Sequence, residues 1–90
     1  MEINSKYQQN EDVYRTIDLP LAAYLKTIGY TVVGIDRKRN KKKASVLIKH
    51  DENLSTVVKE YFDGNSKVEP RSFYDNVRGL KSQIVNRVDE

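Results

Sequence analysis

The chain has 90 residues, no cysteine, and 16 basic against 13 acidic side chains, a formal net charge of +3 at pH 7. Its length suits one domain with a modest core, because a chain of this size buries only roughly 60 to 65% of its unfolded surface. The lack of cysteine excludes disulfides and thiolate chemistry. No apolar stretch approaches the roughly 20 residues of a membrane span, and the polar start is unlike a signal peptide, so we expect a cytoplasmic protein without a membrane partner. Residues 1–12 predict a flexible lead to a single domain over residues 13–90.

A strand and a helix are expected first. Val13 to Thr16 predict a short strand, and Asp18 follows where it can cap a helix with Pro20 in its first turn. Apolar side chains at spacings of 3, 4 and 7 give this helix a buried face. Gly29 supplies the left-handed residue that commonly ends a helix, so we expect the helix to extend to the residue before it.

Two strands joined by a hairpin loop are expected next. Tyr30 to Asp36 are rich in β-branched residues, and Ala44 to Lys49 alternate in polarity, so both predict strands. Gly34 within the first strand indicates a bulge or a close approach. The connecting residues 37–43 contain no glycine, which favours a longer, solvated loop, with Asn40 best able to adopt a positive φ at its tip.

The second half of the chain predicts two helices. The first begins at Leu54 behind Asn53 as a cap, and Gly64 ends it. Lys67 to Glu69 are expected to add a brief edge strand. Pro70 then opens the last helix, whose apolar seam consists of Phe73, Val77, Leu80, Ile84 and Val88.

The predicted order β-α-β-β-α-β-α describes an α+β domain, with three helices against a small, mostly antiparallel sheet. Gly79 lies inside the last helix, where glycine costs up to about 1 kcal/mol relative to alanine. We therefore expect close packing at this position against a neighbouring element, such as another subunit.

The hairpin loop holds most of the positive charge. It carries six of the 16 basic residues, so the rest of the chain has 10 basic and 13 acidic residues, a balance of −3. Clustered lysine and arginine attract polyanions and release counterions when they meet phosphates, although a solvated loop without a ligand remains the alternative. The candidate anion-binding residues of this run are Arg37, Lys38, Arg39, Lys41, Lys42 and Lys43.

The last helix extends the basic surface. Arg71, Arg78 and Lys81 recur at spacings of 7 and 3, so they share one face beside the apolar seam. Arg71 also lies near the helix start, where free amides favour anions. Tyr74 lies one position from the seam and near Arg78, and is the candidate aromatic for stacking on a base. The alternative is an ordinary polar exterior of an amphipathic helix.

The residues expected of an enzyme are scarce. His50 is the only histidine, and Asp51 and Glu52 follow it, but three adjacent residues at a strand end point in different directions. The chain has no glycine-rich phosphate loop and no Ser, His, Asp arrangement. We therefore expect no enzymatic activity, no catalytic residues, no metal and no cofactor.

Several segments resemble a known family. The segment Tyr14 to Leu25 (YRTIDLPLAAYL), then Ile28 to Tyr30, Ile35 to Arg37, Tyr61 to Gly64 and the helix with Phe73 are similar to a family of short, uncharacterised domains of phages and prokaryotes. The resemblance covers about residues 13–85. It implies a shared fold and a phage or mobile-element setting, hence a host cytoplasm, but no catalytic or ligand role. Arg15 belongs to the matching motif, where it either forms an ion pair or binds an anion.

Two functional hypotheses follow. The first is a non-enzymatic, phage-type accessory protein that binds a polyanion, either nucleic acid or a phosphorylated nucleotide ligand, through the hairpin loop and the last helix. The second is a small oligomeric protein-interaction module that inhibits a host defence protein by presenting its basic surface to an acidic one. A homo-oligomer is conceivable because acidic residues could meet the basic loop of a second copy. These acidic residues are Asp51, Glu52, Glu60 and Asp63.

Overall fold

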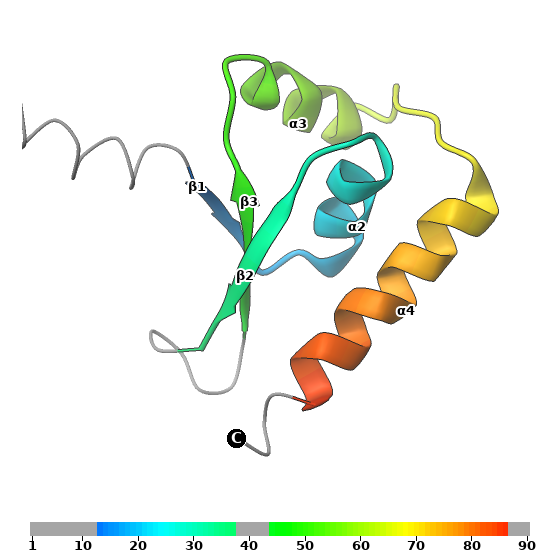
Figure 1. Cartoon of the computed structure of the whole chain (residues 1–90). Coiled ribbons are helices and arrows are strands. Elements are labelled where there is room, and N and C mark those ends of the chain that lie inside the picture. Colours follow the sequence, from blue (N-terminus) through cyan, green and yellow to red (C-terminus); the bar gives the residue numbers. More distant parts are fainter. Residues whose placement is uncertain (1–12, 38–43, 87–90) are drawn as a thin grey trace, which may run out of the picture.

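A computed structural model describes residues 13–37 and 44–86 (Figure 1). The predicted lead, residues 1–12, lies outside this range. Three helices and a three-stranded antiparallel sheet confirm the predicted α+β class. In chain order the elements are β1 (Val13–Thr16), α2 (Leu19–Thr27), β2 (Val32–Asp36), β3 (Ser45–Lys49), α3 (Leu54–Phe62) and α4 (Pro70–Asn86).

The sheet has the strand order β1-β3-β2, so β3 is central and the other two strands form the edges. Val46 and Ile48 of β3 are buried on the side of the helices, whereas Leu47 between them faces the other side. The register of β2 against β3 shifts between Val32 and Gly34, which confirms the bulge predicted at Gly34. A side chain at Gly34 would have room, because its Cβ would lie 3.9 Å from the Leu47 side chain.

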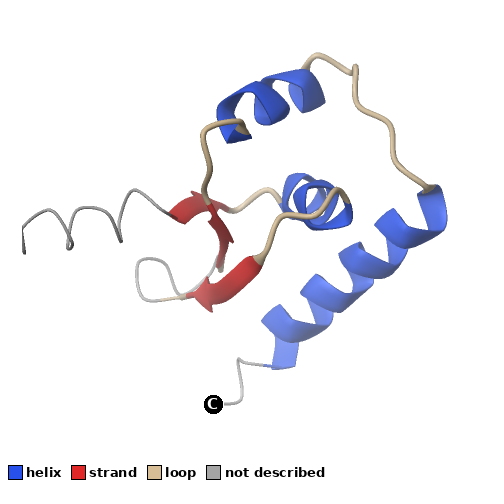
Figure 2. Ribbon diagram, turned by 45° about the horizontal axis from the view of Figure 1, so that its top comes forward, coloured by secondary structure: helices blue, strands red, loops and turns tan. Residues whose placement is uncertain are grey.

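Helix α2 occupies the centre of the fold, between the sheet and α4 (Figure 2). Its five consecutive residues Leu21 to Leu25 are all buried. Asp18 Oδ1 accepts the backbone N–H of Leu21 at 3.0 Å, as predicted for a cap, and Gly29 adopts φ 113° at the end. Ile28 lies outside the helix and is 40% exposed.

The other two helices pack around α2. Leu80 of α4 is completely buried, and Phe73, Val77 and Ile84 pack against the same core. The Asn76 side chain of α4 adds a polar link, donating to Thr27 Oγ1 of α2 at 2.9 Å. Helix α3 buries Leu54, and its Tyr61 ring lies 5.3 Å from that of Tyr24, measured between centroids.

Two local predictions are wrong. The brief strand expected at residues 67–69 is not formed, because these residues belong to the connection between α3 and α4 and the Glu69 side chain caps α4 instead. Glu69 Oε1 accepts the N–H of Ser72 at 2.7 Å. Asn53 precedes α3 as expected, but its side chain makes no capping bond; its backbone N–H donates to Asp51 Oδ1 at 3.0 Å.

Candidate nucleic-acid interface

The outer side of α4 carries a mixed basic and apolar surface, which we call the α4 stripe. Its members recur at spacings of 3 and 4, so they lie on one side of the helix, away from the apolar seam. All five are exposed, and the tyrosine and valine among them are 60% and 57% accessible. The α4 stripe consists of Arg71, Tyr74, Arg78, Lys81 and Val85.

Tyr74 and Arg78 contact each other within the stripe. The Arg78 guanidinium carbon lies 5.8 Å from the centre of the Tyr74 ring, a cation–π arrangement between residues one helical turn apart. Because the tyrosine is 60% exposed, much of its ring stays accessible to a ligand. The prediction that these two residues are neighbours is confirmed.

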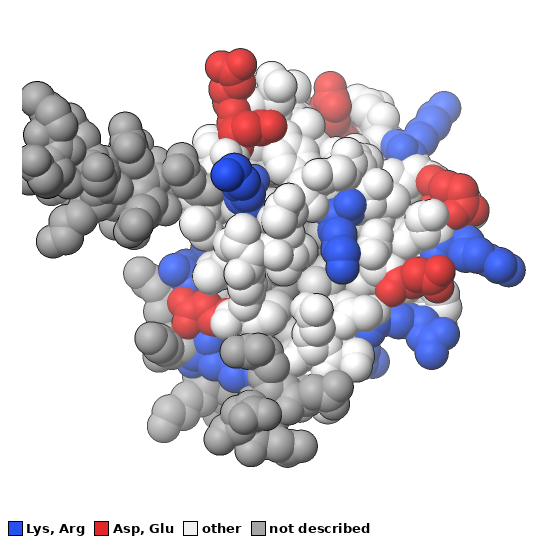
Figure 3. Space-filling view, in the orientation of Figure 1, with Lys and Arg blue, Asp and Glu red and all other residues white. Residues whose placement is uncertain are grey.

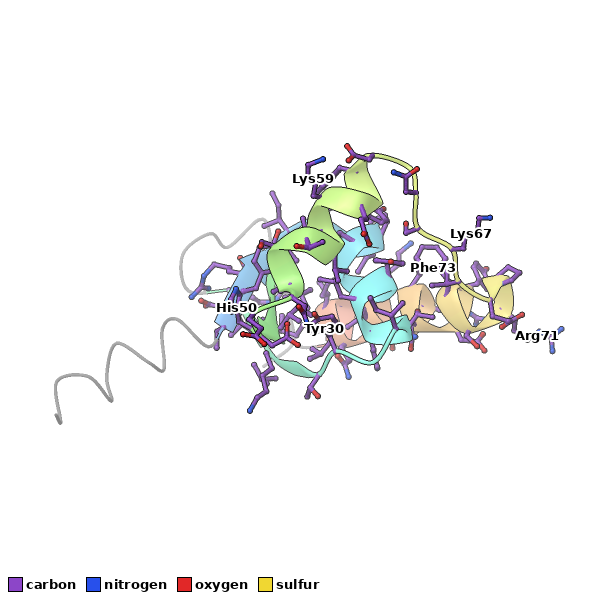
Figure 4. All side chains as sticks on the ribbon, turned by 90° about the horizontal axis from the view of Figure 1, so that it is seen from above. Tyr30, His50, Lys59, Lys67, Arg71 and Phe73 are labelled. Atoms are coloured by element: carbon purple, nitrogen blue, oxygen red, sulfur yellow. The ribbon has the colours of Figure 1, made fainter. Side chains whose placement is uncertain are left out.

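The charge around the stripe is not uniformly positive. Along the side of the molecule that α4 forms (right in Figure 3), basic and acidic side chains alternate. Asp75 is the single acidic residue of α4 (Pro70–Asn86), and its side chain is exposed. In Figure 4, Arg71 extends from the N-terminal end of α4 away from the body of the molecule. A polyanion would therefore contact separate cations along α4 instead of one continuous basic patch.

Arg37 links the hairpin to the C-terminal end of α4. Its Nη2 donates to the backbone carbonyl of Ile84, one of the carbonyls that a helix end leaves without an internal partner. A cation is also favoured there by the helix dipole. The Nε of Arg37 is buried and has no hydrogen-bond partner within the described residues. Arg37 thus has a structural role, and anion binding by this residue stays a prediction.

The rest of the basic run, Lys38 to Lys43, lies outside the described residues. The described chain stops at Arg37 and resumes at Ala44, so the run is joined to the fold beside the end of α4. Arg78 and Lys81 precede Ile84 by six and three residues, which corresponds to about 9 and 4.5 Å along the helix axis. The structure therefore anchors Arg37 at the C-terminal end of α4, about one helical turn beyond Lys81 and two beyond Arg78.

Arg15 is engaged within the sheet. Its Nη1 forms an ion pair with Asp36 Oδ2, and the pair connects the two edge strands β1 and β2 across β3. The two side chains are 38% and 17% exposed. Of the two roles expected for Arg15, the structure shows the ion pair, and its partner lies 21 residues away in the sequence. Anion binding by Arg15 stays a prediction.

His50 and Asp51 follow the end of β3. Figure 4 shows His50 at the opposite end of the molecule from Arg71. Asp51 Oδ1 accepts the Tyr30 hydroxyl at 2.8 Å. Burial, then this hydrogen bond and the Asp51 charge, raise the pKa of Tyr30 to about 12. His50 itself is exposed. Asp51 therefore links the segment between β3 and α3 to Tyr30, which precedes β2. Among the residues that the structure describes, no three acidic or histidine side chains form a group that could hold a metal ion.

A groove that sequence reasoning missed lies between β2 and α4. It has a volume of about 890 Å³ and runs along residues 29–35, with Lys26 of α2 and Gln83 of α4 completing its lining. None of these residues carries a recognisable motif. Only the strand order, which makes β2 an edge, brings them together.

Comparison with known proteins assigns the chain to a family. Residues 11–86 match the model of a domain of unknown function, DUF5659, and the chain belongs to this family. This agrees with the resemblance to an uncharacterised family. Searches of curated proteins and of solved structures gave no match. None of the helices in residues 13–37 and 44–86 combines the length and hydropathy needed to cross a membrane.

Proposed function

We propose that this DUF5659 protein is a non-enzymatic nucleic-acid-binding protein that uses the α4 stripe and the basic run of the hairpin as one surface. The observation that supports the proposal most is the contact between Arg37 and the Ile84 carbonyl, because it joins the start of the run to the C-terminal half of α4, where Lys81 and, at its midpoint, Arg78 lie. Separately, each cationic segment would be an ordinary solvated surface. Together they span enough of the molecule to follow a phosphate backbone.

The chemistry of binding follows from the residues present. Lysine and arginine side chains neutralise phosphates and release condensed counterions, which gives affinity without sequence preference. The exposed ring of Tyr74 provides a face on which a base can stack, and stacking of this kind contributes roughly 1 to 3 kcal/mol per base.

The phage or mobile-element setting that the resemblance implies forms part of this proposal, since small accessory proteins of that kind act inside the host cell. A free phosphorylated nucleotide would use the same cations, but with fewer contacts and a weaker dependence on salt. Inhibition of a host protein through the same basic surface is the competing hypothesis. The experiment below separates a nucleic-acid ligand from a free nucleotide.

The test is fluorescence anisotropy with single- and double-stranded oligonucleotides of 20 nucleotides or base pairs at two salt concentrations. If three to five cations contact phosphates, log affinity should fall with log salt with a slope of roughly 2 to 4. The double variant R78S/K81S should weaken binding and lower the slope by about 1 for each lost phosphate contact. No binding at low salt would exclude the nucleic-acid function.

A matched control distinguishes a site from bulk charge. Lys49 and Lys67 are exposed and lie on β3 and in the loop before α4, outside the α4 stripe. The double variant K49S/K67S removes the same net charge, so it should leave affinity and slope nearly unchanged. An equal loss of affinity in both double variants would mean that binding depends only on the net charge of the protein. Competition by a nucleoside triphosphate at low micromolar concentration would favour a nucleotide ligand.

A further inference from the structure

The groove between β2 and α4 is lined mainly by residues of β2 and of the segment that leads into it. Residues 30–35 form one continuous wall, which includes most of β2, and Gln83 of α4 contributes to the other. Lys26 and Gly29, at the end of α2, complete the lining. In Figure 2 the open side of β2 faces α4, with α2 behind. The shape is an open trough beside the edge of a sheet, with room for an extended chain.

The edge of β2 that faces this groove has no strand partner among the described residues, since β2 pairs only with β3. An edge strand presents alternate N–H and C=O groups that can hydrogen-bond an added strand. Val32 to Asp36 contain neither a lysine nor a proline, the residues that commonly block such pairing. The β-bulge lies at Val33, whose side chain is 52% exposed. An added strand could pair regularly with β2 only on one side of this bulge, which limits its register.

Gly79 is a second, independent observation. It lies one turn before Gln83 on the same side of α4, and a Cβ at this position would meet no atom within 4 Å. Its backbone is not in the left-handed region that requires glycine. Within the described residues, neither packing nor backbone conformation requires a glycine at position 79. Glycine is nevertheless unfavourable in a helix interior. A glycine here lets the backbone of a ligand approach α4 closely.

We propose that this groove binds an extended peptide segment of a partner protein, which adds to β2 as a fourth strand and passes over Gly79. The unpaired edge requires a ligand with its own N–H and C=O groups at strand spacing, which is a peptide. Lys26 is exposed and, within residues 13–37 and 44–86, is the one charged residue that lines the groove, so the segment carries an acidic side chain at that end. The site does not depend on the proposed nucleic-acid surface.

The experiment begins with a displayed library of random nine-residue peptides, selected on the full chain and counter-selected on G79L. We expect enriched peptides with alternating polarity and an acidic residue near one end. In heteronuclear NMR, a selected synthetic peptide should shift the amide signals of residues 31–35 and Gln83. A twin with N-methylated backbone at alternate residues keeps the side chains but cannot form the ladder, and should lose binding at least roughly tenfold.

Two variants test the side walls. Gly79→Leu should retain or raise Tm, since leucine favours a helix more than glycine does, while abolishing peptide binding. Lys26→Glu should weaken binding roughly five- to tenfold, and Lys67→Glu, on the loop before α4, should not. The proposal is overturned if no peptide depends on the groove, if the N-methylated twin binds equally, or if the amide shifts lie elsewhere.

A second copy of the chain is the competing occupant. Sedimentation velocity between about 5 and 500 µM, with amide exchange of β2 measured at both ends of the range, detects it. A concentration-dependent dimer with newly protected β2 amides would assign the groove to self-association and overturn the partner-peptide proposal. A monomer with freely exchanging outer amides throughout the range leaves the groove open for the peptide and supports it.

Discussion

The two helices α2 and α4 lie against each other, yet they use their surfaces differently. All five residues from Leu21 to Leu25 of α2 are buried, with exposures of 7% or less. In the 17-residue α4, Leu80 is the one residue among the buried core, and a whole side of the helix faces outward. The enclosed helix contributes only Lys26, near its C-terminal end, to the groove. The candidate interface, and Gln83 on the far side of the groove, belong to α4.

The largest expected effect concerns the enclosed helix. Leu25→Ala removes a completely buried side chain from the centre of the core and should lower the free energy of unfolding by about 2 to 5 kcal/mol. Val85→Ala, on the α4 stripe, is the matched control and should change it by less than about 0.5 kcal/mol. Urea denaturation followed by circular dichroism measures both. Similar losses in the two variants would contradict the division between the helices.

The next largest loss of stability is expected from removing the N-cap of α2. Asp18→Ala removes the side-chain acceptor of the Leu21 N–H and should cost about 1 kcal/mol, the usual value for a lost N-cap. Asp18→Asn keeps an acceptor oxygen and is the control, with a loss of a few tenths of a kcal/mol. Both values come from the same urea transitions. If Asp18→Asn lowered the free energy of unfolding as much as Asp18→Ala, the charge of Asp18 would stabilise α2, and the capping hydrogen bond would not.

The polar link between the two helices should contribute less. Asn76 Nδ2 donates to Thr27 Oγ1, which itself donates to the Ala23 carbonyl at 2.7 Å. A double-mutant cycle with Asn76→Ala and Thr27→Val should give a coupling energy of about 0.5 to 1.5 kcal/mol. Additive single effects would show that apolar contacts alone hold α4 on α2.

Local signals in the sequence predicted much of this fold. Asp18, Pro20 and Gly29 delimited α2, and Gly34 indicated the bulge, because each depends on backbone chemistry within a few residues. The α4 stripe followed from spacing on a helix. The predicted end of α2 is one residue late, because the helix ends at Thr27 and Ile28, the residue before Gly29, is its C-cap.

Long-range pairs could not be predicted in the same way. Arg37 contacts Ile84 across 47 positions and Arg15 contacts Asp36 across 21, and no local pattern specifies either partner. The groove depends on which strand forms the edge, a property of topology. The strand wrongly predicted at residues 67–69 is a different kind of error, because here a local signal was overlooked. Glu69 precedes Pro70 at the start of α4 and caps this helix by accepting the N–H of Ser72.

The smallest expected effect is at the start of α4, whose cap is exposed and titrates. Hydrogen bonds from Ser72 and the Arg71 backbone stabilise the carboxylate and hold the pKa of Glu69 below its ordinary value. A carboxyl group with a lowered folded pKa stabilises the protein above its unfolded pKa, and this stabilisation is lost as pH falls through the folded pKa. The Tm difference between the wild type and Glu69→Gln should therefore shrink on acidification.

A carbon-detected NMR titration of the Glu69 carboxyl group measures the same property directly. Its midpoint should fall below that of a glutamate in an unstructured peptide. Ser72→Pro, which removes the N–H that Glu69 accepts, is tolerated in the first turn of a helix and should return the midpoint toward the ordinary value. A midpoint that Ser72→Pro does not move would show that α4 starts without this cap. In that case α4 would differ from α2 in two ways: one of its sides is exposed, and its first turn would lack the side-chain cap that Asp18 gives to α2.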